Sequence, residues 1–332
     1  MLQRTGAVVK HFEDFQEDQF DFHAYCVRKV TLRAYTEVLS FEDNIWSENY
    51  YYRAASGITR IYLNLFDDPS IMEGDKEPDY SKMTAAERKK AKAIARKKRN
   101  QAEKKASEKA KSESQENGGA AKAKGKTSPV DEDPEGKELL KLDPLLEAKK
   151  YSSILSTHCP TRLGTWTLQY DVAVRRKKWL LALQALCKMN SLDPLNAEYF
   201  CRLVDFALKV PTLDGLSEPA KLVLSEEFPK LLSGKTVETY VSEAAQSARS
   251  NKTTSLPLRV AVAESLIATK LESAGSAASI ITDGGIAIPG VSVDSCRVAL
   301  VSLKKLGPDA SKTTDAWVSM VKETFPMIKN FQ

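Results

Sequence analysis

Residues 20–68 read FDFHAYCVRKVTLRAYTEVLSFEDNIWSENYYYRAASGITRIYLNLFDD, and this stretch decides the fold class. Apolar and small residues recur in it at alternating spacings of four and three, which places them along one side of a helix. The rhythm stops at a polar turn around 42–49 and then returns, so two amphipathic helices are expected to pack antiparallel. The two predicted stripes are Phe20, Ala24, Val27, Thr31, Ala34, Val38 and Phe41, and Tyr52, Ala55, Thr59, Tyr62 and Phe66.

Neither helix of this pair can bury its stripe alone, so each pair needs neighbouring pairs. The sequence therefore predicts an all-α, TPR-like helical-repeat superhelix, that is, an α-solenoid. Residues 1–19 are expected to be the tail of an earlier helix with Ala7, His11 and Phe15 on its stripe. We expect the array to continue upstream of Met1.

The charge of the chain is unevenly distributed. The 332 residues are 42% hydrophobic, which suffices for a sizeable core, and the net charge is +5. Residues 82–126 contain sixteen Lys or Arg against five Glu, about +11, so the remainder carries about −6. Such a basic insert favours a phosphate-bearing partner, meaning RNA, DNA or an anionic membrane; the alternative is a solvated charged linker.

The segment from Ser81 to Lys150, which includes the basic insert, contains no Phe, Tyr or Trp. Its first half is rich in helix formers and predicts a long solvated helix that frays after about Ser112, followed by a flexible, partly disordered tether. The same run also resembles a nuclear-import signal. The candidate RNA-binding residues are Arg88, Lys89, Lys90, Lys92, Arg96, Lys97, Lys98, Arg99, Lys104 and Lys105.

Three regions follow from this pattern. TPR-like repeats are predicted over residues 1–72, the basic helix and tether over 73–142, and a C-terminal TPR-like helical region over 143–332. The last region begins at Asp143-Pro144, a helix N-cap followed by Pro at the first helical position. Its helix is expected to run to about Ser156.

The clearest repeat signature lies between 163 and 194. Trp166, Ala182, Leu186 and Pro194 match the spacing of Trp, a small residue, a large apolar residue and Pro in the tetratricopeptide pattern, whereas the Gly and Tyr positions of that pattern do not match. We interpret these four as repeat-packing residues. A further helix is expected over 197–209.

Weaker helical patterns follow Pro211, over roughly 218–232, 236–247, 256–271, 293–305 and 314–329. The isoleucines at 280, 281, 286 and 288 could form a short strand pair, although helix or loop is favoured because the rest of the chain offers no sheet to join.

The sequence shows no active site. The five cysteines (Cys26, Cys159, Cys187, Cys201 and Cys296) are odd in number and widely spaced, which is typical of reduced thiols in an intracellular protein. The three histidines (His11, His23 and His158) are scattered away from metal-ligand spacing. No signal peptide and no uninterrupted run of 18 apolar residues is present, so a soluble protein, cytoplasmic or nuclear, is expected.

Five segments in order carry a family resemblance: FDFHAYCVRKVTLRAYTEVLSFED, YYRAASGITRIYLNLFDDP, the Lys-rich insert, KLDPLLEAKKYSSIL and WLLALQALCKMNSLDPLNAEYF. Together they resemble the C-terminal part of the auxiliary subunit of the NatA N-terminal acetyltransferase complex, the large tetratricopeptide-repeat subunit. The resemblance covers residues 1 to about 210, and ETFPMIKNF near the end resembles the last helix of the family.

The resemblance implies a non-catalytic scaffold. In the family, a helical superhelix wraps around a small GNAT-fold catalytic subunit, shapes its active site for small first residues, and anchors it to the ribosome for co-translational N-terminal acetylation. No catalytic, cofactor-binding or metal-binding residue is expected in this chain, because acetyl-CoA belongs to the partner. Expected partners are the catalytic subunit, the ribosome and its RNA, and a small regulatory subunit of the huntingtin-interacting protein K type, without a membrane.

A second hypothesis makes the chain an RNA-binding or nuclear helical-repeat adaptor that uses its Lys/Arg-rich segment without an acetyltransferase partner. The first hypothesis predicts a cytoplasmic, ribosome-associated protein, and the second a nuclear one.

Overall fold

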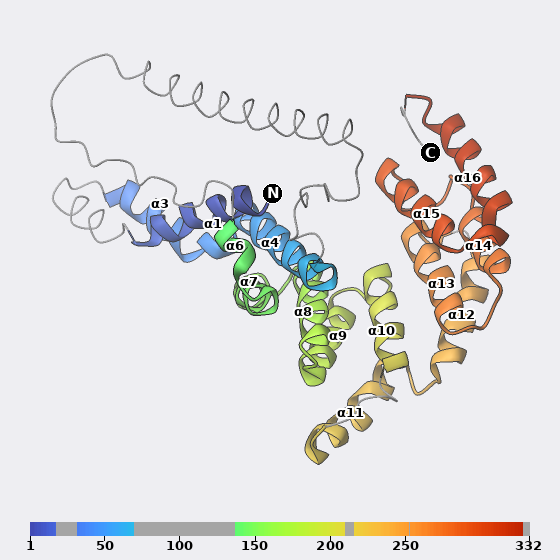
Figure 1. Ribbon diagram of the computed structural model, residues 1–332, viewed down its shortest axis with the longest axis horizontal. Helices are drawn as coiled ribbons and strands as arrows, with labels where there is room; N and C mark the ends of the chain where they lie inside the picture. Colours follow the sequence, from blue (N-terminus) through green and yellow to red (C-terminus); the bar gives the residue numbers. More distant parts are fainter. Residues whose placement is uncertain (18–31, 70–136, 210–215, 252, 328–332) are drawn as a thin grey trace, which may run out of the picture. The chain divides into compact units, whose positions relative to one another are not determined.

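The computed structural model describes residues 1–17, 32–69, 137–209, 216–251 and 253–327 (Figure 1). Within these ranges every regular element is a helix, which confirms the predicted all-α, helical-repeat fold class. The chain divides into two compact units, Met1–Leu63 with Leu145–Gln332, and Asn64–Pro144. The boundaries predicted at 72/73 and 142/143 remain predictions, and the basic helix and tether lie almost entirely outside the described residues.

The elements of the first part are α1 (Leu2–Glu17), α3 (Leu32–Asp43), the 3-10 turn η1 (Ile45–Ser47), α4 (Asn49–Asp67), α6 (Lys137–Lys141) and α7 (Pro144–His158). Those that follow are α8 (Leu163–Arg175), α9 (Trp179–Leu192), α10 (Ala197–Lys209), α11 (Glu218–Leu231), α12 (Val237–Ser250), α13 (Leu256–Ala268), α14 (Ala274–Asp283), α15 (Val293–Lys305), the 3-10 turn η4 (Pro308–Ala310) and α16 (Ser311–Thr324).

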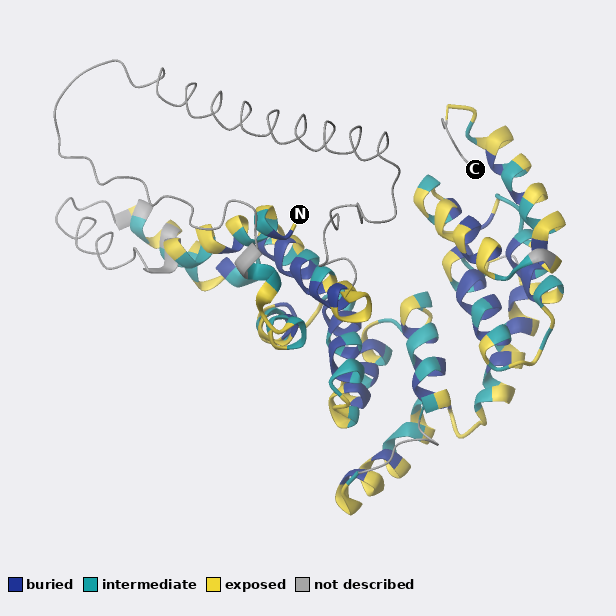
Figure 2. Cartoon of the chain, viewed as in Figure 1, coloured by how far each residue is buried: buried dark blue, intermediate teal, exposed yellow. Residues whose placement is uncertain are grey.

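Helix α4 confirms the second helix predicted from the opening stretch, and it ends before Asp68-Pro69 because Pro cannot continue a helix. Ala55, Thr59 and Tyr62 are buried as expected, but Phe66 is exposed. The buried face is also wider than the predicted stripe (Figure 2). It includes Tyr51, Ala54, Ile58, Leu63 and Leu65.

The predicted stripe of α1 is wrong. Ala7 and His11 are exposed, whereas Leu2 and Val9 are buried and Phe12 packs edge-on against Tyr51 at 5.6 Å between ring centroids. The sparse apolar residues of this helix fit two stripes equally well, and only the position of Tyr51 selects one. Phe41, which was predicted on the stripe of the first helix of the opening stretch, is likewise exposed. The part of that predicted helix before Leu32 lies outside the described residues.

Arg162 joins segments that the basic insert separates in sequence. Its guanidinium lies over the ring of Tyr52 at 4.4 Å from the centroid and donates to Asn49 Oδ1 and to the backbone carbonyl of Ser47, at 3.2 and 3.3 Å. The neighbouring Cys159 Sγ donates to the carbonyl of Trp46. The start of α4 and the turn between α7 and α8 are therefore held together across more than 100 residues.

Helices α8 to α11 share one apolar core, here called the α8–α11 core. Helices α8 and α9 form a hairpin through a tight turn in which Lys177 has φ of 56°. Phe206 of α10 lies at the centre, with its ring 6.3 Å from Tyr170, 6.5 Å from Trp179 and 5.4 Å from Phe228. One aromatic side chain thus contacts the three other helices of this core.

Helices α10 and α12 to α16 enclose a second core, here called the C-terminal core. Helix α14 was not among the predicted helices, and it buries Ile280 and Ile281, so the helical alternative is correct for these two and the strand pair is wrong. Ile288 is buried in the loop that follows. The last predicted helix, 314–329, instead starts at Ser311 and ends at Thr324.

A buried arginine ties the loops of the C-terminal core together. Arg259 is 1% exposed, and its guanidinium donates to the backbone carbonyls of Asn251, Thr254 and Ile280 at 3.0 to 3.2 Å. Burial lowers the pKa of Arg259, and Asp283 acts in the opposite direction. Its three partners are carbonyl oxygens at the end of α12, in the loop after it and in α14, so one guanidinium connects these three segments.

Gly284 makes room for this arginine. A Cβ at Gly284 would lie 2.9 Å from Cζ of Arg259 and 2.9 Å from Cδ1 of Ile288, although the backbone φ of −70° suits any residue. Because three hydrogen bonds hold Arg259 in place, it cannot move aside cheaply.

We expect Gly284→Ala to lower the free energy of unfolding by about 1–3 kcal/mol, through overpacking against Arg259. Gly275→Ala, near the start of α14, is the control, because the nearest neighbour of the added Cβ would be Asp309 O at 3.6 Å, an ordinary contact. It should change stability by no more than about 0.5 kcal/mol or raise it. Chemical denaturation of both variants measures the difference; equal stabilities would contradict the role of Arg259.

Candidate partner-binding surface

Helix α10 presents three different faces, because residues three and four apart lie on the same side of a helix. Tyr199, Leu203 and Phe206 enter the α8–α11 core, while Phe200 and Val204 enter the C-terminal core. The third face is polar and turns toward α8. It carries Glu198, Arg202, Asp205 and Lys209.

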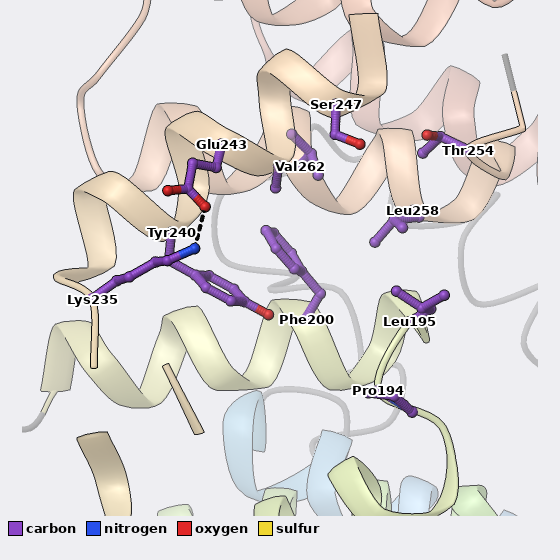
Figure 3. Close-up of a pocket in the computed structure, with 11 residues that line it drawn as sticks. Pro194, Leu195, Phe200, Lys235, Tyr240, Glu243, Ser247, Thr254, Leu258 and Val262 are labelled. Atoms are coloured by element: carbon purple, nitrogen blue, oxygen red, sulfur yellow. Dashed lines mark hydrogen bonds and ion pairs between the residues drawn. The ribbon is translucent and has the colours of Figure 1, made fainter. Parts of the chain in front are cut away.

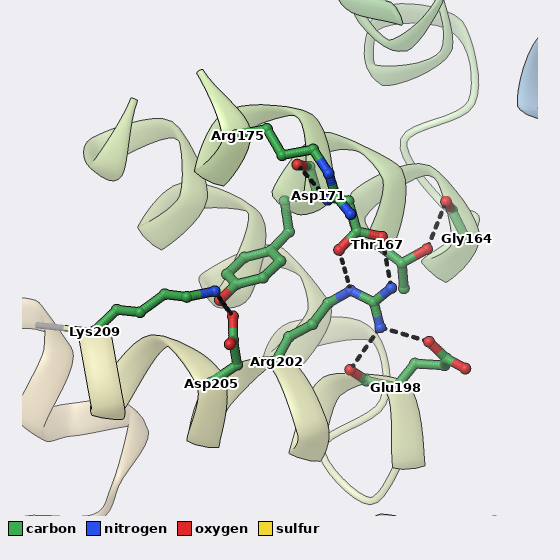
Figure 4. A network of polar contacts seen from close by, with 9 residues as sticks. Gly164, Thr167, Asp171, Arg175, Glu198, Arg202, Asp205 and Lys209 are labelled. Atoms are coloured by element: carbon green, nitrogen blue, oxygen red, sulfur yellow. Dashed lines mark hydrogen bonds and ion pairs between the residues drawn. The ribbon is translucent and has the colours of Figure 1, made fainter. Parts of the chain in front are cut away.

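Arg202 joins this face to α8 by a two-pronged ion pair (Figure 4). Its Nε donates to Asp171 Oδ1 at 3.1 Å and its Nη2 donates to Asp171 Oδ2 at 2.7 Å, while Nη1 donates to the Glu198 carboxylate. Burial lowers the pKa of Arg202, but the charges and hydrogen bonds of Asp171 and Glu198 outweigh it, so the pKa is raised overall. The guanidinium is therefore charged and fixed in place.

A second polar pair lies beside the first. The Tyr170 hydroxyl donates to Asp205 Oδ2 at 2.7 Å, and Lys209 Nζ donates to the same oxygen at 2.6 Å. Burial and the nearby Asp205 charge raise the pKa of Tyr170, so the phenol is neutral at physiological pH. Tyr170 stands where the tetratricopeptide pattern has Gly, and it fills that space with a ring that reaches α10.

The α8–α10 polar face is thus a patch of mixed charge made of Asp171 and Arg175 on α8 and of Glu198, Arg202, Asp205 and Lys209 on α10. Repeat arrays bind other proteins over extended surfaces to which successive helices contribute. Its acids are paired with bases, so it offers fixed hydrogen-bonding groups and no group poised for proton transfer.

The predicted repeat-packing residues have different surroundings. Trp166 is buried and donates its indole N–H to Pro160 O at 2.7 Å, and Ala182 and Leu186 are fully buried in the α8–α11 core. The structure brings these three together. Pro194 lies exposed in the turn before α10, away from them.

The ten predicted ribosome- or RNA-binding residues, Arg88 to Lys105, lie outside the described residues. The α8–α10 polar face was not predicted, although a signal was present. Charged residues recur in α10 at 198, 202, 205 and 209, with the spacing of one helix face.

The cysteines of the described residues are free thiols. Cys159 and Cys296 are buried and Cys187 and Cys201 are half-buried, while Cys26 lies outside the described residues. Burial raises the pKa of all four, that of Cys201 to about 12, so none is an activated nucleophile. His11 and His158 are exposed, and no cluster of His, Cys, Asp or Glu in the described part of the chain could hold a metal.

A family model described as "N-terminal acetyltransferase A, auxiliary subunit" matches residues 1–189. The chain belongs to this family. An auxiliary subunit is not the catalytic one, which agrees with the prediction that the chain has no active site of its own.

Two relatives extend the match. The chain is 40% identical over 235 residues to the N-terminal acetyltransferase A complex auxiliary subunit NAA15 of Arabidopsis thaliana, covering 69% of this chain and 26% of that protein. It is 32% identical over 246 residues to the human N-alpha-acetyltransferase 16, NatA auxiliary subunit, covering 72% and 28%. The chain thus spans about a quarter of the length of these relatives.

A solved structure described as "Naa15/Naa10 bound to HypK-THB" aligns with 68% of this chain and 26% of the matched chain, at 23% identity and a TM-score of 0.46. Among the described helices, none is both long enough and apolar enough to span a lipid bilayer.

Arg202→Lys should lower the free energy of unfolding by about 1–2 kcal/mol, because a lysine cannot form the two-pronged pair with Asp171. Arg297→Lys is the matched control, since the pair of Arg297 with Asp294 is long, at 3.5 Å, and both side chains are more than half exposed. It should cost no more than about 0.5 kcal/mol. Thermal unfolding of the two variants distinguishes them; similar losses would contradict the special role of Arg202.

Proposed function

We propose that the chain is part of a non-catalytic scaffold of the N-terminal acetyltransferase A complex, which holds a GNAT-fold catalytic subunit. Membership of the auxiliary-subunit family is the observation that carries this proposal. The α8–α10 polar face supplies the candidate contact surface. Its side chains are held by hydrogen bonds before any partner arrives, so binding orders few of them.

The chemistry of acetyl transfer belongs to the catalytic partner in this proposal, and so does acetyl-CoA. The thiols in the described residues are held neutral by burial, and the acids of the α8–α10 polar face are paired with bases. This chain instead contributes position: it holds the catalytic subunit and brings it to its substrate. By the family resemblance, a small regulatory subunit of the huntingtin-interacting protein K type would join the same assembly.

The basic segment would attach the assembly to the ribosome. Its surplus of Lys and Arg over Glu, about +11 over 82–126, suits the phosphates of ribosomal RNA. This predicts a cytoplasmic, ribosome-associated protein. The alternative, a nuclear RNA-binding adaptor, uses the same segment and differs in having no acetyltransferase partner.

The first test is co-purification of the full chain with a co-expressed catalytic N-acetyltransferase subunit, followed by an assay of acetylation of a peptide that begins with Ser. Activity should appear with the complex and not with the chain alone. Glu198→Lys should weaken the complex about tenfold or more, because it reverses a charge on the α8–α10 polar face while Arg202 keeps Asp171.

Glu218→Lys is the matched control, since Glu218 also forms an intrahelical ion pair but lies on α11, away from that face. A complex weakened equally by both variants would argue against the α8–α10 polar face as the contact. A chain that never co-purifies with the catalytic subunit would contradict the scaffold proposal.

The second test measures binding of the full chain to ribosomal RNA at increasing salt. If the basic segment contacts phosphates, the logarithm of affinity should fall by about 0.7 to 0.9 per contacted phosphate for each tenfold rise in salt. Changing Arg96, Lys97, Lys98 and Arg99 to Gln should flatten the slope, whereas changing Lys304 and Lys305 to Gln should not. RNA binding without any acetyltransferase partner would favour the adaptor.

A further inference from the structure

The solvent-exposed side of α9 carries positive charge and leucines, and no acidic residue lies along the helix. Leu181, Lys188 and Leu192 are exposed and recur at spacings of seven and four, which places them on one side. The turn that precedes the helix adds three further cations, Arg176, Lys177 and Lys178. We propose that this surface, here called the α9 basic face, is a docking site for an acidic segment of a partner protein that also carries apolar side chains.

The cations of the α9 basic face are not neutralised by neighbouring acids. Within the described residues, no ion pair is formed by Arg176, Lys177, Lys178 or Lys188. Asp193, the first acid after the helix, accepts two hydrogen bonds within its own turn. On α11, which packs against α9, Glu227 is paired with Lys230. The α9 basic face therefore has a surplus of positive charge, which an acidic partner would complement.

The turn between α8 and α9 keeps its cations at positions that are unfavourable for the fold alone. Lys177 has φ of 56°, in the left-handed region that glycine adopts most readily. Lys177 and Lys178 also precede the N-terminus of α9, the positive end of its dipole, and its first turn contains no acid. Hydrogen bonds from Lys177 N to Val174 O and from Lys178 N to Ala173 O, at 3.0 and 2.8 Å, fix this turn. A bound carboxylate would offset the unfavourable charge, and such local costs are expected where a surface has a function.

The leucines of the α9 basic face favour an acidic protein segment over other polyanions. Leu181 is 39% exposed and Leu192 is 40% exposed, and the two lie about 16 Å apart along the helix with Lys188 between them. RNA would meet the cations with phosphates but would leave the leucines without apolar partners. An anionic membrane takes up one continuous apolar face, whereas here a cation interrupts the leucines. A protein segment can place acids and apolar side chains in turn along the same line.

Further apolar surface follows in the turn after α9. Leu195 is 76% exposed there, at the rim of a groove between α10, α12 and α13 (Figure 3). The charged residues of the groove lining are Lys235 and Glu243, which form an ion pair with each other. The groove thus adds apolar surface beside Leu192 without adding net charge. The acids of the partner are therefore expected along α9 and in front of it, at the cations.

The test uses a fluorescein-labelled peptide of about 16 residues built from Glu, Ala and Leu, with Leu at every third or fourth position. A second peptide has Ala in place of each Leu, and a third has Gln in place of each Glu. Fluorescence anisotropy with the full chain should show saturable binding of the first peptide and at least about tenfold weaker binding of the other two. The basic segment of the chain also attracts acids, so the second peptide measures that contribution.

Lys188→Glu should weaken binding of the first peptide about tenfold or more, because it places an acid in the middle of the α9 basic face. Lys322→Glu is the matched control: it makes the same change of charge at an exposed lysine on α16 and should alter binding by no more than about twofold. Both variants keep the basic segment, so a difference between them belongs to α9. Equal thermal midpoints show that both are folded.

Three results would overturn the proposal: no saturable binding up to about 1 mM of the first peptide, equal binding of the first and second peptides, or equal binding by the Lys188→Glu and Lys322→Glu variants. The same two variants are compared on a single-stranded RNA of about 20 nucleotides and on phosphatidylcholine vesicles that contain phosphatidylserine. If Lys188→Glu weakened binding to either of these and not to the first peptide, the α9 basic face would belong to that ligand instead. None of these outcomes depends on the acetyltransferase scaffold, since no catalytic subunit is present in the assay.

Discussion

Helix α10 is the element on which both cores depend, because it buries two of its sides in different directions. Tyr199, Leu203 and Phe206 close the α8–α11 core, and Phe200 and Val204 close the C-terminal core. A helix shared in this way cannot rotate to improve one contact without losing the other. The register of α10 therefore couples the packing of the helices before it to that of the helices after it.

The same constraint determines where the polar side of α10 lies. With two sides of α10 buried, its remaining side must be polar, and there Arg202 and Asp205 meet Asp171 and Tyr170 of α8. On its buried side, Phe200 stacks its ring on that of Tyr240 of α12, with the centroids 5.5 Å apart.

Helix positions could be predicted from the sequence because local signals mark them. Pro144 at the first helical position starts α7, and the polar turn before Trp179 separates α8 from α9. The buried faces of weakly apolar helices could not be predicted, as α1 shows, since several stripes fit a sparse pattern. Helix α14 was not predicted, although Ala274, Ala277, Ala278 and Ile281 follow helix spacing, because small Ala and Ser side chains give a weak hydrophobic signal and the helix ends among glycines.

By itself, the sequence determined that the chain is helical, that it joins helix pairs in series, that a basic segment interrupts them, and that no catalytic signature is present. These are properties of local pattern and composition, which survive without knowledge of any contact. Only the tertiary structure decided that Arg202 meets Asp171, that Gly284 makes room for Arg259, and that Leu195 rims a groove. Each of these joins residues from different helices, and their distance depends on how whole helices pack rather than on the residues between them.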